Sequence, residues 1–176
     1  MSTKLFCVLL AFCFGVIYCY LEIIPERIDI PFTHPDHVVN ASAIVKRYGR
    51  RSPYYIVGRI TLKQTWNNNV TIHMDVYEYL HNEYRLSFMT VHNKLCNLIN
   101  TDILLGIILR RLDIGCPLYP GLVEVRNATF KWEHFPYVIP YTKALANITL
   151  HHSATNELLM WLKLHVRVKQ HGNKKN

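Results

Sequence analysis

A strict alternation of apolar and polar residues near the C-terminal end constrains the fold more than any other feature of this sequence. From Glu157 to Lys169, apolar side chains occupy every second position, opposite Trp, Lys, His and Arg. A period of two residues is typical of a β-strand with one buried face. The same period recurs in Thr142–His151 and in Val70–Leu80. Three such segments predict a protein built mainly of half-buried strands.

Further segments extend this β pattern along the chain. The pair His81-Asn82 predicts a turn that joins Val70–Leu80 to a second strand, Tyr84–His92, as a hairpin. Two more segments are rich in β-forming residues, and they are Tyr54–Lys63 and Leu122–Trp132. The sequence therefore predicts six or seven strands.

The segment between positions 96 and 116 has helical spacing of its apolar residues. Thr101 is a plausible N-cap, and Asp102 suits a first helical turn. Arg110 and Arg111 fall in the last turn, where the helix dipole favours positive charge. We therefore expect one short helix, Asp102–Leu112, in a mainly β protein whose strands form an antiparallel sandwich or cup.

The N-terminal segment predicts export from the cell. Lys4 precedes an apolar run, Leu5–Tyr18, that has the length of a signal-peptide core and is too short to span a bilayer as a helix. A buried N-terminal helix or a membrane anchor is the alternative. We expect a signal peptide at 1–19, a single β domain at 20–170 and a disordered tail at 171–176. The protein is then secreted and extracellular, and is not an integral membrane protein.

Four Asn-x-Ser/Thr tripeptides lie in the region that would remain after signal cleavage. One such tripeptide arises easily by chance, but four behind a signal peptide predict glycosylation and exposed positions. They begin at Asn40, Asn69, Asn127 and Asn147.

The cysteines are divided between the predicted signal peptide and the mature chain. Of the five, only Cys96 and Cys116 lie clearly beyond the signal segment. In an oxidising compartment these two have one intramolecular way to pair, which predicts a disulfide that encloses the helix. Two free thiols are the alternative, and cleavage before Cys19 would leave a third, unpaired thiol.

The positive charge of the chain does not indicate a nucleic-acid ligand. The formal net charge is +8, but most basic residues are scattered, and nucleic-acid binding conflicts with secretion. Acidic lipid headgroups or sulphated glycans would also suit a basic protein.

The sequence carries none of the motifs that would indicate an enzyme or a metal site. It has no H-E-x-x-H, no G-x-S-x-G and no phosphate-binding glycine loop. His73, His81 and His92 could meet across the predicted hairpin, but three histidines alone are weak evidence for a metal site. We expect no catalytic residues, no metal and no cofactor.

One face of the predicted sheets is continuously apolar and includes large, flexible side chains. If the two sheets pack tightly, these residues form an ordinary core; if the sheets splay, they line a pocket for a lipid-like ligand. The periodicity alone does not distinguish the two arrangements. The candidate ligand-lining residues are Met74, Val76, Phe88, Ile148, Met160, Leu162 and Leu164.

An ordered series of motifs resembles a known group of secreted proteins. Lys94-Leu95-Cys96 precedes the helix, 115–121 reads Gly-Cys-Pro-Leu-Tyr-Pro-Gly, and 136–140 reads Pro-Tyr-Val-Ile-Pro. The series is similar to insect proteins related to the ganglioside GM2 activator and to ML (lipid-recognition) domains, and most to the CheA/CheB chemosensory proteins of flies. The resemblance covers roughly Tyr54–Val168. The chain departs from the ganglioside activator in having cysteines for one disulfide instead of several.

The resemblance implies a β-cup that holds an apolar ligand without catalytic residues. It therefore favours splayed sheets and a secreted carrier of hydrophobic small molecules or lipids that acts in pheromone or gustatory detection beside a sensory membrane receptor. The alternative is a receptor accessory or adapter protein that works by surface contact and carries no ligand.

Overall fold

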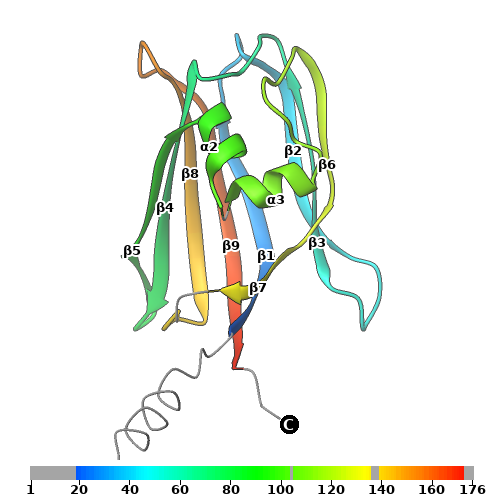
Figure 1. Ribbon diagram of the computed structural model, residues 1–176, viewed down its shortest axis with the longest axis vertical. Helices are drawn as coiled ribbons and strands as arrows, with labels where there is room; N and C mark the ends of the chain where they lie inside the picture. The colour runs from blue at the N-terminus through cyan, green and yellow to red at the C-terminus, as the bar shows by residue number, and fades with distance from the viewer. Residues whose placement is uncertain (1–18, 104, 136–138, 173–176) are drawn as a thin grey trace, which may run out of the picture.

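The computed structural model describes residues 19–103, 105–135 and 139–172 and is mainly β, with two antiparallel sheets and two short helices in that part of the chain (Figure 1). The helices lie beside the two sheets, with α2 against strands β4 and β5 and α3 extending from α2 toward β6 (Figure 1). The elements are β1 (Cys19–Thr33), β2 (Val38–Arg47), β3 (Tyr54–Leu62), β4 (Val70–Leu80), β5 (Glu83–Lys94), α2 (Leu95–Thr101), α3 (Leu105–Arg111), β6 (Gly121–Ala128), β7 (Phe130–Phe135), β8 (Lys143–His152) and β9 (Leu158–Gly172).

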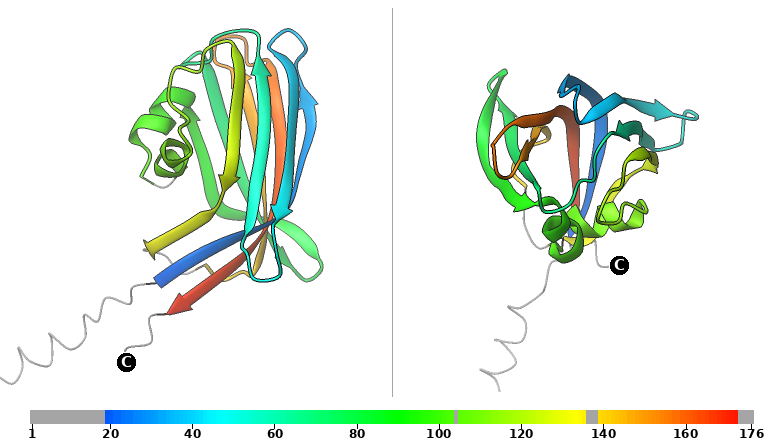
Figure 2. Two further views of the ribbon diagram at one scale, coloured as in Figure 1. Left: turned by 90° about the vertical axis from the view of Figure 1, so that its right-hand side faces the viewer. Right: turned by 90° about the horizontal axis from the view of Figure 1, so that it is seen from above.

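The strands are divided between a larger and a smaller sheet that face each other. The larger sheet has the order β5-β4-β8-β9-β1-β7, and the smaller sheet has the order β2-β3-β6. Strand β1 runs from the larger sheet directly into β2 of the smaller one, so the two sheets adjoin along this side (Figure 2). Seen from above, the helices lie on the opposite side, between the β4–β5 hairpin and β6 (Figure 2).

The predicted β-hairpin is confirmed, including its turn. Leu80 pairs with Glu83 at the end of the β4–β5 ladder. His81 and Asn82 between them both have positive φ, of 50° and 66°. Two successive residues with positive φ match the twist of antiparallel strands in a two-residue turn, and asparagine tolerates that conformation well.

The segment predicted as one strand, Leu122–Trp132, is instead two strands in different sheets. Strand β6 pairs with β3 in the smaller sheet, whereas β7 pairs with β1 in the larger one. Asn127, near the end of β6, has a positive φ of 54°, which turns the chain out of an extended path. The prediction of a single strand was wrong because the apolar pattern continues through this change of direction.

Strands β1 and β2 were not predicted, and the pairing of β1 explains why its pattern was hard to read. Its ladder with β9 shifts register between Pro25 and Arg27 and again between Asp29 and Phe32. Each bulge moves the following residues to the other face, so the period of two is broken twice. Pro25, which is buried, lies beside the first bulge, where the missing N–H of proline is tolerated.

The predicted helix Asp102–Leu112 corresponds to α3, and a second helix, α2, which was not predicted, precedes it and ends just before Asp102. The chain is extended at Asp102, with φ −70° and ψ 129°, which ends α2. The Asp102 carboxylate accepts hydrogen bonds from the backbone N–H of Leu105 at 2.6 Å and of Gly106 at 3.4 Å. It therefore caps α3, whereas Thr101, the predicted N-cap, donates its hydroxyl to the Asn97 carbonyl within α2.

Gly106 allows the two helices to approach closely. A Cβ atom at this position would lie 2.8 Å from the backbone oxygen of Ile99 and would also overlap the backbone oxygen of Leu98. Arg110, in the last turn of α3, donates a hydrogen bond to the same Ile99 oxygen. The guanidinium thus satisfies a carbonyl at the end of α2 that has no partner within the helix.

The ends of the described region can be compared with the predicted domain limits. Strand β9 continues to Gly172, two residues beyond the predicted end of the domain at 170. The remainder of the predicted tail, and residues 1–18 of the predicted signal peptide, lie outside the described residues. Within the described residues, no helix has the length and apolarity needed to cross a membrane.

Candidate ligand site between the two sheets

Two clusters of buried apolar residues pack on the larger sheet, and one of them also joins it to the smaller sheet. The Trp66 cluster joins both sheets and α2, and its buried members are Val38, Leu62, Trp66, Val70, Leu95, Ile99, Leu150, Leu159 and Met160. The Tyr141 cluster lies further along the larger sheet, and its buried members are Leu21, Met74, Val76, Ile139, Tyr141, Ala144, Val166 and Val168. The face of the larger sheet that carries both clusters is called the inner face below.

Strands β8 and β9 carry four inner-face residue pairs in succession along their ladder. The first pair is Ala144 with Val166, and the last is Leu150 with Met160. Both pairs are buried, with exposed fractions of 2% and 6% in the first and 7% and 6% in the last. The first pair belongs to the Tyr141 cluster and the last to the Trp66 cluster, so each end of this strip is covered.

The two pairs between these ends are partly exposed. They are Ala146 with Leu164 and Ile148 with Leu162, and we call these four residues the central patch. Ile148 is the residue of the patch that packs against both clusters. Because these four residues alternate in step with the buried pairs on either side, they leave accessible apolar surface in the middle of the inner face.

Six of the seven residues predicted to line a ligand site lie on the inner face. Ile148, Leu162 and Leu164 belong to the central patch. Met74, Val76 and Met160 are buried around it, with exposed fractions of 9%, 7% and 6%. Ala146, the fourth patch residue, was not predicted, because an alanine carries little weight in an apolar alternation.

Phe88 was predicted on the inner face, and this prediction was wrong. Its side chain is 71% exposed, whereas the neighbouring Ser87 and Met89 point inward. The β4–β5 ladder pairs Tyr77 with Leu86 and contains a bulge before the next pair, so the even-numbered residues here share the outer face. Apolar residues occur on both faces of β5, and its sequence therefore does not show which face is buried.

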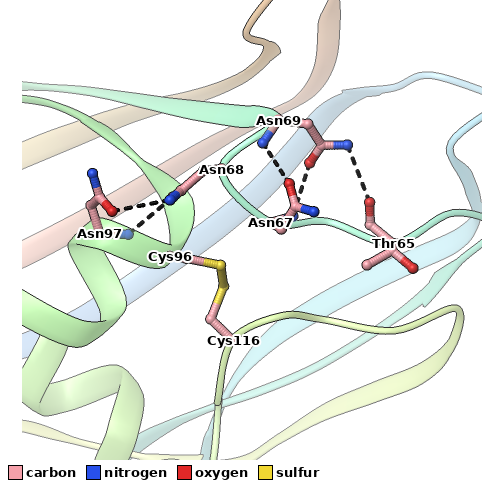
Figure 3. The surroundings of a disulfide bond; sticks show 7 residues. All are labelled: Thr65, Asn67, Asn68, Asn69, Cys96, Asn97 and Cys116. Carbon is pink, nitrogen blue, oxygen red and sulfur yellow. Dashed lines mark hydrogen bonds between the residues drawn. A yellow bond between two sulfur atoms is a disulfide. The ribbon is translucent and has the colours of Figure 1, made fainter.

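The disulfide fixes the helical segment at one end of the two sheets. Cys96 and Cys116 are bonded as predicted, with their Cα atoms 5.3 Å apart, and the bridge encloses both helices (Figure 3). Asn68, in the loop between β3 and β4, accepts a hydrogen bond from the backbone N–H of Asn97 at 3.2 Å and donates to its side-chain oxygen at 3.1 Å (Figure 3). This loop thus satisfies an N–H in the first turn of α2 that the helix leaves without a partner.

A small polar group lies on the inner face beside the central patch. The Tyr141 hydroxyl, on a side chain that is 4% exposed, donates a hydrogen bond to the Met89 sulfur at 3.3 Å. Burial raises the pKa of this hydroxyl, a hydrogen bond with Ser87 lowers it, and the negative charge of Glu78 raises it. Neither Ser87 nor Tyr141 was predicted as a site residue, because single polar residues in an apolar stretch leave no periodic signal.

The indole N–H of Trp66 has no hydrogen-bond partner within the described residues. The nitrogen itself has less than 1 Å² of exposed surface and sits in the densely packed Trp66 cluster. It therefore faces neither solvent nor the accessible surface of the central patch.

The outer surface carries hollows of a different chemical character. One of about 830 Å³ lies between the C-terminal end of α3, the Cys116 loop and β6, and its walls include Arg111, Asp113, Glu124 and Arg126. Charged walls of this kind do not suit an apolar ligand. None of the seven predicted lining residues contributes to this hollow.

Three histidines gather on the outer face of the larger sheet. The rings of His73 and His92 are 4.0 Å apart, and those of His73 and His151 are 5.1 Å apart. Burial, and then the positive charges that His92 and His151 would carry, lower the pKa of His73, while Asp75 raises it. In residues 19–103, 105–135 and 139–172, no group of three or more His, Cys, Asp or Glu side chains is arranged to hold a metal ion.

The four predicted glycosylation sites differ in their surroundings. Asn40 and Asn127 are exposed on strands of the smaller sheet. Asn147 is half-buried on the outer face, where its side-chain oxygen accepts a hydrogen bond from the Trp161 indole at 2.6 Å. Asn69 is also half-buried, and the nitrogen that would carry a glycan donates to the Thr65 carbonyl at 3.3 Å (Figure 3).

No model of a known protein family matches the sequence. A search of curated proteins likewise returns no match.

Proposed function

We propose that the protein is a secreted, non-enzymatic carrier of hydrophobic small molecules or lipids. The observation that carries this proposal is the central patch, where Ala146, Ile148, Leu162 and Leu164 remain accessible on a face that is buried on either side of them. Removing apolar surface from water contributes about 25 cal/mol per Å². An apolar ligand seated on the patch gains this stabilisation and covers the surface that the protein leaves open.

The geometry of the fold supports uptake between the layers. The two sheets adjoin along β1 and β2, while the opposite side is bounded by two short helices of seven residues each. Leu105 packs against the Tyr141 cluster, and Leu109, one turn later, packs against the Trp66 cluster. Helix α3 therefore spans the level of the central patch, and a small shift of this helix would change access to it.

The sequence resemblance favours the same function. The chain has a disulfide around its helical segment and the sequence Cys-Pro-x-x-x-Gly at 116–121, and this combination resembles that of the ML-related and CheA/CheB-like proteins described above. We propose on this basis an ML-like role in insect chemosensation, in which the protein delivers a pheromone-like or gustatory cue to a sensory membrane receptor.

The proposal is tested by titrating the secreted, lipid-extracted protein with a fluorescent fatty probe and by native mass spectrometry. We expect saturable binding of one probe per chain, lost in Ala146→Leu, which fills the central patch, and retained in Phe88→Ser on the outer face. No probe uptake by the unmodified protein would refute the proposal.

A second candidate function is supported by the outer face of β5. Leu86 and Phe88 are 59% and 71% exposed on this edge strand, a surface suited to contact with a partner protein. An adapter that carries no ligand predicts that Phe88→Ser abolishes the response of sensory neurons to an applied cue while Ala146→Leu leaves it intact. A carrier predicts that Ala146→Leu abolishes the response.

A further inference from the structure

The Tyr141 hydroxyl is a buried hydrogen-bond donor with a weak acceptor. The hydroxyl donates its proton to the Met89 sulfur, while its hydrogen bond with Ser87 lowers its pKa and is therefore one that Ser87 donates to the Tyr141 oxygen. Thioether sulfur accepts hydrogen bonds poorly compared with a carbonyl or hydroxyl oxygen. The side chain is 4% exposed, so water does not supply a better acceptor. A buried hydroxyl in this state gains free energy when an oxygen takes the place of the sulfur.

The hydroxyl lies close to the proposed ligand. Tyr141 is a buried member of the Tyr141 cluster, and Ala146, Ile148 and Leu164 of the central patch pack against this cluster. The backbone around it is fixed, because the neighbouring Thr142 carbonyl accepts a hydrogen bond from the Val168 N–H at 2.8 Å. The donor is therefore held in place at one end of the accessible apolar surface.

The Met89 side chain can move aside more easily than its neighbours. Methionine has three rotatable side-chain bonds and adapts to irregular spaces. Met89 is only partly buried, on the edge strand β5, whereas Tyr141 is buried. Displacement of this side chain would expose the hydroxyl to a ligand without rearrangement of the sheet.

The charges near Tyr141 disfavour an anionic ligand group. Glu78 pairs with buried Ala144 across the β4–β8 ladder, which places it on the same face as Tyr141. Its negative charge raises the pKa of the Tyr141 hydroxyl, after the larger effect of burial. Arg85 lies opposite Glu78 in the β4–β5 ladder, but its guanidinium bonds to Glu83 at 2.6 Å. A ligand carboxylate would meet the field of Glu78 and would also lose its hydration.

We propose that the ligand is an apolar chain with one neutral oxygen acceptor, such as an ester, ketone or alcohol, and that the Tyr141 hydroxyl binds this oxygen in place of the Met89 sulfur. The inference rests on the proposed carrier function and names its ligand class. The apolar chain lies over the central patch and supplies most of the affinity, while the oxygen selects among chains of similar length.

The test is competition for the bound fluorescent probe by hexadecane, methyl hexadecanoate and hexadecanoic acid. We expect the ester to compete about three- to tenfold more tightly than the hydrocarbon, which is the range for one added hydrogen bond, and more tightly than the acid. In Tyr141→Phe the advantage of the ester over the hydrocarbon disappears, while the affinity for hexadecane is unchanged. Tyr48→Phe is the matched control, because it removes a hydroxyl that bonds to Asn127 on the exposed surface.

A second variant keeps the inference testable if Tyr141→Phe does not fold. Met89→Leu preserves the side-chain volume but removes the competing sulfur, so the preference for the ester should be retained or increased. Equal competition by ester and hydrocarbon, or loss of the ester preference in Met89→Leu, would overturn the inference and leave the carrier function standing. Failure of all three compounds to displace the probe, or of the probe to bind, would overturn both.

Discussion

The Trp66 cluster and the central patch both include residues of β8 and β9, yet the cluster is buried and the patch is partly exposed. In the cluster, Leu159 is 0% exposed and Met160 6%, because residues from both sheets and from α2 converge on them. Leu162, two residues after Met160 on β9, faces the same way as Met160 and remains partly exposed. The same alternation along a strand therefore gives either a buried core or an accessible surface, depending on whether side chains from the facing elements cover it.

The elements that close the Trp66 end come from distant parts of the chain. Trp66 and Val70 lie in and after the β3–β4 loop, Leu95 and Ile99 come from α2, and the disulfide at Cys96 secures that helix. Trp66 also exchanges two backbone hydrogen bonds with Leu118, of 2.8 and 2.9 Å, beyond the second cysteine. A disulfide, backbone hydrogen bonds and buried apolar contacts therefore all secure this end of the fold.

The comparison is tested most strongly by truncating one leucine in each region. Leu159→Ala should lower the free energy of unfolding by about 2–5 kcal/mol, since it leaves a cavity in a packed cluster. Leu162→Ala, on the same strand, should cost less than about 2 kcal/mol, because part of its side chain is already accessible. Chemical denaturation of both variants measures the difference, and equal losses would contradict the distinction.

Loss of the disulfide should destabilise α2 and the Trp66 cluster and leave the central patch unaffected. A bridge with a sequence separation of 20 residues stabilises the folded chain by about 3 kcal/mol on the chain-entropy model. Cys96→Ser and Cys116→Ser should each lower the melting temperature under non-reducing conditions and reduce the secreted yield. Unchanged thermal stability in either variant would show that the bridge does not support the helices.

A substitution at the contact between α2 and α3 should have a smaller effect on stability. In Gly106→Ala, the added methyl group would overlap the Leu98 and Ile99 carbonyls, so α3 must move away from α2. We expect a loss of about 1–3 kcal/mol, measured by denaturation, as for other overpacked sites. Gly115→Ala, where a Cβ meets no atom within 4 Å, is the control and should have little effect.

The sequence predicted the strands whose alternation is unbroken and missed those that change face or direction. Strands β4, β8 and β9 have clear periods of two, and all three were assigned. In contrast, the bulges of β1 and β5 erased the pattern that would have located β1 and oriented Phe88. Helix α2 was missed for a different reason, since its seven residues make only about two turns and give too short an apolar pattern to recognise.

The candidate site was predictable only in part. The inner-face residues Ile148, Leu162 and Leu164 follow from periodicity. Whether they are covered depends on the facing layer, which local patterns do not describe. Tyr141 enters the site through a tertiary contact with Met89, on another strand, and no spacing in the sequence connects the two residues.

Acid should have a smaller effect, confined to the outer face. The pKa of His73 is lowered in the folded protein, chiefly by burial, so below its ordinary value of 6.5 the unfolded chain binds more protons than the folded one. The contribution of His73 to stability should therefore be constant above that pH and decrease as the pH drops from about 6.5 through the lowered pKa of the folded state. Melting curves of the protein and of His73→Gln measure this loss, which should be smaller in the variant. An acid loss of equal size in both would assign the sensitivity to other groups.

The most direct test of whether the central patch is open compares two alanines that lie two residues apart on the inner face of β8. Ala144 is 2% exposed, whereas Ala146 belongs to the central patch. In lipid-extracted protein, Ala144→Leu should lower the free energy of unfolding by about 1–3 kcal/mol through overpacking, while Ala146→Leu should stay within about 1 kcal/mol of the unmodified protein. Equal destabilisation by the two substitutions would mean that the space beside Ala146 is already filled, and would contradict the account.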